Sequence, residues 1–252
     1  MTTALELAAA AGGALLAGGI NAVAGGGTLV SFPVLVALGV PPLHANVTST
    51  IALCPGHFGG VHAQRTLLTG QRCRAARMLP SAALGGLAGS ILLVSTSESL
   101  FESVVPWLII TACLLLGLQD RIRAAAFAHR ATQHREAPIG LMVGVFVGAI
   151  YGGYFGAGLG IVLLAMMGIL LDDDLPKLNA LKSVLAGTIN TIAAVFLSFT
   201  GTAEWWFVGV MAPASLVGGH LGGRLATRMK PAVLRAVVIT LGVTVAVKLL
   251  LD

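Results

Sequence analysis

Charged residues are scarce in this sequence. Asp, Glu, Lys and Arg make up 10% of its 252 residues, against about 25% in soluble globular proteins. Hydrophobic residues make up 56%, and the mean hydropathy is +0.92. So few charges cannot cover a water-exposed surface, which excludes an ordinary soluble domain. At about 20 residues per crossing, the length allows roughly eight to ten membrane segments and little else.

Cysteines and catalytic signatures are also few. The cysteines Cys54, Cys73 and Cys113 form no CxxC pair, so neither a disulfide framework nor a thiolate metal site is indicated. The sequence has no GxSxG, HExxH or Walker A motif and no paired intramembrane carboxylates, which argues against an enzyme. We expect no cofactor and no metal. Without a nucleotide-binding site, any transport has to be driven by a gradient.

The apolar runs predict an all-α polytopic membrane protein. They are continuous rather than alternating, and a bilayer requires every backbone polar group to be bonded internally, so we expect helices. Two of the runs, 28–41 and 158–171, have only 14 residues each. Each reaches about 21 Å, short of the ~30 Å hydrocarbon core, and is predicted to be a half-helix or a re-entrant piece. The ten predicted segments are 4–24, 28–41, 44–64, 78–95, 103–119, 139–155, 158–171, 178–200, 205–223 and 233–250.

The net charge of +5 indicates orientation rather than nucleic-acid binding, because Lys and Arg collect in cytoplasmic loops. The basic stretches 65–77, 120–136 and 224–235 are therefore assigned to the cytoplasm. The stretches 95–102 and 201–204 carry Glu without Lys or Arg and are assigned to the outside. Both termini then fall outside.

An internal repeat divides the chain. The stretch Pro80–Gly89 (PSAALGGLAG) matches Pro213–Gly222 (PASLVGGHLG) at an offset of 133. Pro42–Ser49 (PLHANVTS) matches Pro176–Ser183 (PKLNALKS) at an offset of 134. We therefore expect a first transmembrane repeat at 1–119, a basic cytoplasmic linker at 120–138, and a second repeat at 139–252.

The second repeat is expected to be inverted, because each copy holds five segments, an odd number. Equivalent loops also have opposite charge: the loop after the third segment is basic in the first half and acidic in the second. Inverted repeats with interrupted helices are typical of secondary transporters with a site at the repeat interface. Chance matching of glycine-rich helices is the alternative.

The glycine breaks are the first candidate site. A helix that begins just after a break presents unpaired N–H groups and the positive end of its dipole, which bind anions without a charged side chain. The alternative is that these glycines serve only close helix packing. The predicted residues are Gly25, Gly26, Gly27 and Thr28 in the first half and Gly156 and Gly158 in the second.

Polar side chains in apolar segments complete this site. Lys182 is the sharpest candidate, because an ammonium at membrane depth needs a cavity or a partner, and it could neutralise an anion. Snorkelling to the cytoplasmic interface is the alternative. For the neutral side chains Asn46, Thr48 and Ser49, the alternative is that they cap a helix or bond its backbone. Asn190 lies eight residues after Lys182 and is therefore expected on the same helical face. The neutral hydrogen-bonding candidates are Asn21, Asn46, Thr48, Ser49, Ser183 and Asn190.

His57 and Cys54 leave two further interpretations open. A histidine at this depth could relay protons, although packing within the helix bundle explains it as well. Cys54 with His57 could also form a reactive pair, which would make the protein a membrane-embedded enzyme acting on a lipid or a thiol. An assembly subunit without transport is a third interpretation.

The sequence resembles the sulfite exporter TauE/SafE family. The stretch Gly19–Leu35 (GINAVAGGGTLVSFPVL), followed by Gly39–Ser49 (GVPPLHANVTS), is similar to its first motif, and Gly152–Gly160 (GGYFGAGLG) with Asn179–Ser183 (NALKS) resembles the second. No proline in the second copy matches Pro33, so we expect a less marked break there.

The resemblance covers nearly the whole chain and implies a bacterial inner-membrane transporter of sulfite, sulfonates or related organic anions. The expected partners are a small anionic substrate, the lipid bilayer and a coupling proton or sodium ion, with no nucleic acid. The direction of transport, the choice of coupling ion and the existence of a homo-oligomer stay open.

Overall fold

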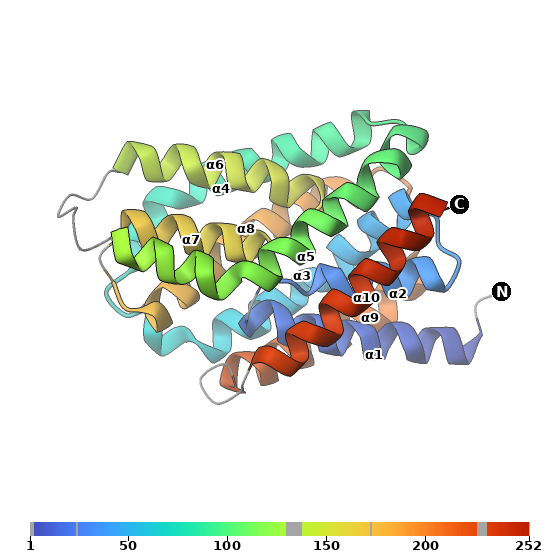
Figure 1. Cartoon of the computed structure of the whole chain (residues 1–252), viewed down its shortest axis with the longest axis horizontal. Coiled ribbons are helices and arrows are strands. Elements are labelled where there is room, and N and C mark those ends of the chain that lie inside the picture. The colour runs from blue at the N-terminus through green and yellow to red at the C-terminus, as the bar shows by residue number, and fades with distance from the viewer. Residues whose placement is uncertain (1–2, 24, 130–137, 172, 226–230, 252) are drawn as a thin grey trace.

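The computed structural model describes residues 3–23, 25–129, 138–171, 173–225 and 231–251. These ranges fold into ten α-helices and one short 3-10 helix, with no strand. The helices lie along one long axis in an elongated bundle (Figure 1). They are α1 (Ala4–Val23), α2 (Thr28–Ala37), α3 (Pro42–Ala63), η1 (Arg65–Leu68), α4 (Arg72–Ser95), α5 (Glu98–His129), α6 (Pro138–Tyr154), α7 (Leu159–Leu170), α8 (Leu175–Leu197), α9 (Trp205–Leu225) and α10 (Pro231–Leu251).

The chain is a multi-pass membrane protein by the length and composition of its helices. Within the described ranges, four helices are long and apolar enough to cross a membrane: Ala4–Val23, Arg72–Ser95, Glu98–Ile122 and Leu175–Leu197. The outer surface is also apolar. Leu84 and Trp107 are each 61% exposed and Leu114 is 58% exposed, which suits side chains that face lipid rather than water.

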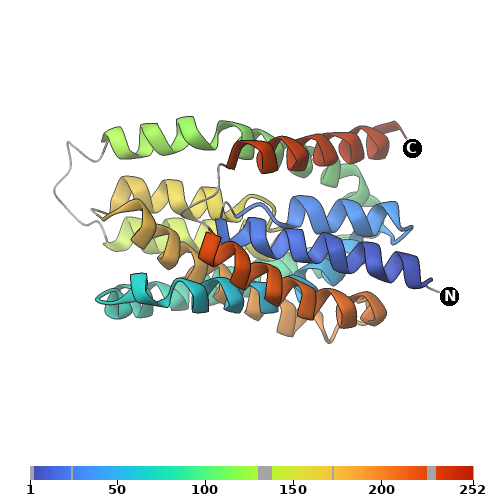
Figure 2. The same ribbon diagram turned by 90° about the horizontal axis from the view of Figure 1, so that it is seen from below.

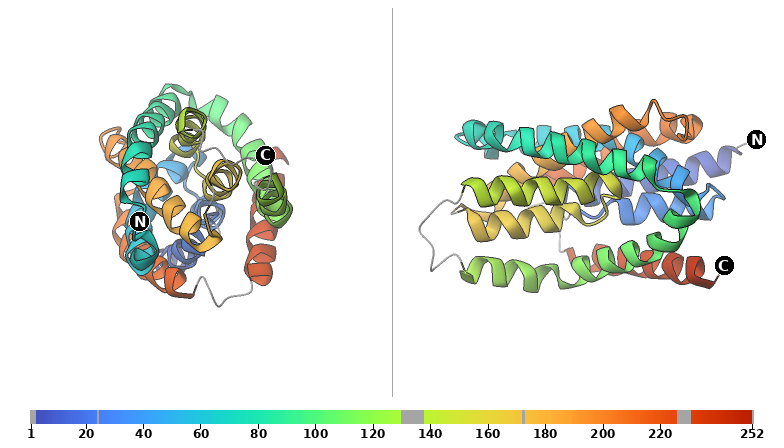
Figure 3. Two further views of the ribbon diagram at one scale, coloured as in Figure 1. Left: turned by 90° about the vertical axis from the view of Figure 1, so that its left-hand side faces the viewer. Right: turned by 90° about the horizontal axis from the view of Figure 1, so that it is seen from above.

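The expected short segments are short helices. α2 has 10 residues and α7 has 12, so they reach only about 15 Å and 18 Å. α2 turns back toward the end of the bundle from which α1 enters, and α7 turns back toward the opposite end, where α6 begins (Figure 3). Each short helix therefore reverses the direction of the helix that precedes it, as expected of a re-entrant piece. The second break is as complete as the first, although no proline there matches Pro33.

The loop expected at 120–138 is shorter than the sequence indicated. α5 continues to His129 and α6 begins at Pro138, so residues 120–129 are helical; residues 130–137 lie outside the described ranges. The basic stretch 65–77 is also mostly helical, as η1 and the first turn of α4. Part of the stretch 224–235 likewise lies outside the described residues.

Helices of the first half pack mainly against helices of the second half. α9 packs against α1 and α3, and α4 packs in the same way against α6 and α8. α5 and α10 lie side by side along one flank (Figure 2). The bundle is therefore an interlocked structure rather than two separate five-helix units.

Glycines set these close approaches. A Cβ added at Gly219 would fall on the backbone of Gly56 in α3, and one at Gly218 would fall on Leu15 in α1. The matching glycines of α4 behave in the same way toward α8 and α6, because Gly86 lies against Ile189 and Gly85 against Phe146. The pairs at the common offset of 133 are Gly85 with Gly218, Gly86 with Gly219 and Gly89 with Gly222.

We predict that Gly219→Ala destabilises the protein although alanine favours helix. Forcing a methyl into backbone contact costs about 1–3 kcal/mol or more, whereas Ala exceeds Gly in helix propensity by about 1 kcal/mol. Gly209→Ala in the same helix is the control, because nothing lies within 4 Å of its added Cβ. Thermal unfolding in detergent should show a lowered midpoint for Gly219→Ala alone; equal midpoints would contradict the packing.

Candidate functional site

The two helix breaks begin with the same backbone turn and end differently, because Gly27 before α2 has φ −62° and Gly158 before α7 has φ +77°. In the first, Gly25 has φ +82° and its N–H donates to the Ile20 carbonyl at 3.0 Å. In the second, Gly156 has φ +76° and donates to the Tyr151 carbonyl at 3.1 Å. Only glycine adopts such a φ readily, so the glycine requirement at these positions comes from the turn and not from helix packing alone.

The two breaks touch in the middle of the bundle. A Cβ added at Gly25 would fall on the backbone of Gly160 in the first turn of α7. Phe155 of the second break packs edge-to-face on Phe32 of α2, with ring centroids 5.6 Å apart, and both rings are buried. The first turns of α2 and α7 therefore meet at a common point, and neither has a side-chain cap.

Asn21 and Lys182 hold the first break from two sides. The Gly27 N–H donates to Asn21 Oδ1 at 2.7 Å, which fixes the turn into α2. Lys182 Nζ, on α8, lies 3.5 Å from the Asn21 carbonyl oxygen. Lys182 is only 1% exposed, so its ammonium reaches into the centre of the bundle and does not snorkel to the surface.

A small cavity lies between the breaks and the helices α3 and α8. Its free volume is about 20 Å³, room for a single water molecule. Among the described residues, the lining includes two titratable groups, Lys182 and His57, and no carboxylate. The lining residues are Asn21, Gly25, Thr28, Thr50, His57, Gly152, Phe155, Gly156, Leu159, Gly160, Lys182, Ser183, Ala186 and Asn190.

The structure places seven of the predicted site residues at this cavity and six elsewhere. Three of the latter hold neighbouring segments together: Asn46 Nδ2 donates to the Tyr154 carbonyl at 2.9 Å, Thr48 Oγ1 accepts from the Glu204 N–H at 3.0 Å, and Ser49 Oγ lies 2.5 Å from Ser31 Oγ. These contacts favour the capping and packing alternative. The lining of the cavity also omits Gly26, Gly27 and Gly158.

Several lining residues were not predicted. Thr50 and His57 lie seven residues apart on α3, a spacing that places both on one face of a helix, and this signal was available in the sequence. Asn190, predicted to share a face with Lys182, does so and donates to the Thr50 carbonyl at 2.9 Å. The other unpredicted lining residues are small or apolar, and only the packing of the helices brings them to the cavity. They are Gly152, Phe155, Leu159, Gly160 and Ala186.

Comparison with known proteins places the chain among transporters. The family described as "Sulfite exporter TauE/SafE" matches residues 10–249. The chain belongs to the TauE/SafE family. This is a family of membrane transporters and not of enzymes, so the interpretation of Cys54 and His57 as a reactive pair is set aside.

Three relatives are similar over nearly the full length of this TauE/SafE protein. The "Probable membrane transporter protein ORF9" of Sinorhizobium sp is 26% identical over 95% of this chain and 90% of its own length. The "Probable membrane transporter protein YfcA" of Escherichia coli K12 is 26% identical, with 95% and 87% covered. A "Probable membrane transporter protein" of Haemophilus influenzae is 28% identical, with 92% and 90% covered. No solved structure matches the chain.

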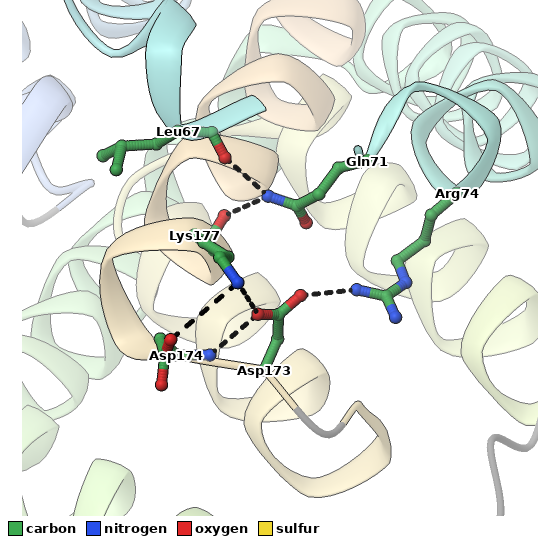
Figure 4. A network of polar contacts seen from close by, with 6 residues as sticks. All are labelled: Leu67, Gln71, Arg74, Asp173, Asp174 and Lys177. Atoms are coloured by element: carbon green, nitrogen blue, oxygen red, sulfur yellow. Dashed lines mark hydrogen bonds and ion pairs between the residues drawn. The ribbon is translucent and has the colours of Figure 1, made fainter. Parts of the chain in front are cut away.

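An ionic network in this TauE/SafE protein closes one end of the bundle. Arg74 at the start of α4 donates to Asp173 Oδ2 at 2.8 Å, and Lys177 Nζ lies 3.2 Å from Asp173 Oδ1 (Figure 4). Gln71 Nε2 adds hydrogen bonds to the carbonyls of Leu67 and Lys177. The network joins the start of α4 to the loop between α7 and α8.

The opposite end carries a smaller polar cluster. His44 at the start of α3 lies 3.7 Å from Glu98 and 3.7 Å from Glu204, so the loops 95–102 and 201–204 meet there. In this cluster the start of α3 contacts the segment that leads into α9. In the ionic network the start of α8 contacts the segment that leads into α4. The basic stretch 65–77 and the acidic stretch 201–204 therefore lie at opposite ends of the long axis (Figure 1).

Asp173 is the titratable centre of the first network. Partial burial alone would raise the pKa of its carboxyl, but hydrogen bonds from the Asp174 N–H, Arg74 and Lys177 outweigh burial and hold that pKa below its ordinary value. Ionised Asp173 therefore stabilises the fold fully above the ordinary carboxyl pKa of about 3.9. This contribution is lost as the pH falls through the lower folded-state pKa.

We predict that Asp173→Asn lowers stability by about 1 kcal/mol at neutral pH and by less near pH 3. Asp174→Asn is the control, because its side chain is 78% exposed and lies 3.9 Å from Lys177. Thermal unfolding in detergent between about pH 3 and pH 7 measures both. A pH-independent effect of Asp173→Asn would contradict the assignment.

Proposed function

We propose that this TauE/SafE protein is a secondary active transporter of small anions, sulfite or organosulfonates, in the bacterial inner membrane. The observation that carries the proposal is the central cavity, where two helix starts without a side-chain cap converge with one buried ammonium. The described residues of its lining include no carboxylate. The family description and the bacterial relatives named as probable membrane transporters support it.

The charge balance of the cavity favours a negative solute. Each helix start contributes the equivalent of roughly half a positive charge, and Lys182 adds a full one. A charge at membrane depth usually faces a partner or a cavity, and Lys182 lines this cavity, where a bound anion would lie beside its ammonium. The hydroxyl-bearing residues Thr28 and Thr50 also line the cavity and suit the several acceptor oxygens of a sulfite or sulfonate group. The Ser183 hydroxyl, which also lines it, donates to the Asn179 carbonyl at 3.0 Å.

The architecture we propose for this transporter is two inverted repeats. Equivalent backbone bonds close both breaks, and equivalent glycines set the contacts of α4 and α9. The loops of opposite charge lie at opposite ends of the bundle. These structural matches occur at positions that the sequence offsets relate, and they support a common fold for the two halves, entered from opposite sides of the membrane.

The small size of the cavity supports transport by alternating access. A free volume of about 20 Å³ holds one water molecule but not sulfite, so substrate entry requires the lining helices to separate. The re-entrant pieces α2 and α7 are suited to this movement, because each is joined to its neighbour by a glycine turn. We propose that they open the cavity to one side at a time, driven by an ion gradient.

The decisive test is Lys182→Gln, which keeps most of the side-chain volume and removes the charge. We expect sulfite and sulfonate flux in proteoliposomes to fall at least tenfold, corresponding to about 1.4 kcal/mol of lost anion stabilisation. Lys177→Gln is the matched control, because this lysine lies on the same helix but its side chain is 45% exposed at the ionic network. It should transport normally.

Insertion and folding are checked by membrane yield and by the thermal midpoint of each variant. Unchanged anion flux in a well-folded Lys182→Gln protein would contradict the role of the ammonium. Absence of sulfite and sulfonate flux in the wild type would contradict the proposed function itself.

A further inference from the structure

The cavity contains an imidazole that the transport proposal does not yet use. His57 on α3 lines the cavity together with Lys182 on α8, and these are the two titratable side chains of the lining. No carboxylate of the part of the chain that the structure describes lines the cavity with them. The ammonium of Lys182 has no lone pair and cannot accept a proton. The imidazole of His57 is therefore the group in the lining that can bind one.

Packing directs His57 toward α8. Its neighbours Gly56 and Gly59 face α9, where added Cβ atoms would fall on the backbones of Ser215 and Leu216. On the α8 side, a Cβ added at Gly187 would lie 3.4 Å from His57 Cβ. The glycine leaves room for the imidazole against α8, on the helix that also carries Lys182.

The charged and titratable groups around His57 come from few elements. α8 presents Lys182, which lines the same cavity as His57. α9 presents His220, whose ring lies 5.7 Å from that of His62, and neither of these histidines lines the cavity. The thiol of Cys54 contacts Thr191 Oγ1. The cavity residues from α1, α2, α6 and α7 are neutral, and α5 contributes none.

We propose that His57 is the proton-binding residue of the transporter, which takes up one proton when a sulfonate or sulfite anion enters the cavity and releases it when the anion leaves. This inference rests on the proposed function and names its coupling ion. An anion beside the ring offsets the positive charges of Lys182 and of an imidazolium, so binding of the anion favours binding of the proton.

The proton balance is simple. The proton comes from water on the side to which the cavity is open, adds to the free ring nitrogen, and returns to water on the other side. One proton then moves with each anion, so movement of a monovalent anion carries no net charge. A gradient of one pH unit can therefore drive about a tenfold gradient of the anion.

Methanesulfonate is the suitable probe, because it keeps one negative charge between about pH 5 and pH 8, whereas sulfite itself titrates in this range. In proteoliposomes, we expect the wild type to accumulate methanesulfonate about tenfold per pH unit, toward the alkaline side. His57→Asn should retain exchange of labelled methanesulfonate at equal pH but lose accumulation driven by the pH gradient. His62→Asn, on the same helix but outside the cavity, should behave as wild type.

A second measurement is proton uptake by purified wild-type protein in weakly buffered detergent on addition of methanesulfonate, with His57→Gln beside it. We expect uptake in the wild type and none in the variant. Exchange without any pH-driven accumulation or proton uptake in the wild type would overturn the role of His57 and leave the transporter intact. Retained pH-driven accumulation in His57→Asn would overturn it as well. If His57→Asn does not insert, the comparison of proton uptake between the wild type and His57→Gln decides. No flux of any sulfonate or sulfite would instead overturn the proposed function.

Discussion

The contact between the two helix breaks is the constraint on which the centre of this protein depends. Gly25 lies on the backbone of Gly160 so closely that no side chain fits between them. This contact brings the starts of α2 and α7 to one point, and it is feasible because each break contains a glycine with positive φ, Gly25 in the first and Gly156 in the second. The cavity, the convergence of helix dipoles and the reach of Lys182 all follow from it. A larger residue at either break would separate these features.

The same physical logic explains why the site is poor in charge. A carboxylate in the lining would neutralise Lys182 and cancel the positive ends of the two helices, and the cavity would then have little preference for an anion. The strong ionic contacts of the described residues instead lie at the ends of the bundle, as in the Arg74–Asp173–Lys177 network. The ionic contacts thus lie near water, whereas the cavity is lined by two helix starts, the Lys182 ammonium and the His57 imidazole.

Composition and continuous apolar runs were enough to predict an all-α membrane protein, and the lengths of the runs predicted that α2 and α7 are short. The sequence also indicated the glycine turns, Lys182 and the shared face of Lys182 and Asn190. It could not distinguish a buried polar residue that faces a cavity from one that holds a neighbouring helix. Thr48 caps the start of α9 from 156 residues away, and Asn46 binds the end of α6; such partners depend on how the halves interlock. Helix ends in the basic stretches were missed because charged residues continue a helix beyond the apolar run that identifies it.

The most direct test of this arrangement is to determine from which side of the membrane two cysteines at opposite ends of the bundle can be labelled. Cys73 is naturally exposed beside the ionic network, and Cys73→Ser combined with Thr202→Cys moves the exposed thiol into the acidic stretch 201–204. A membrane-impermeant maleimide should label the Thr202→Cys protein in right-side-out vesicles and the wild type in inside-out vesicles. Labelling of both thiols from the same side would contradict opposed breaks that meet in the middle of the membrane.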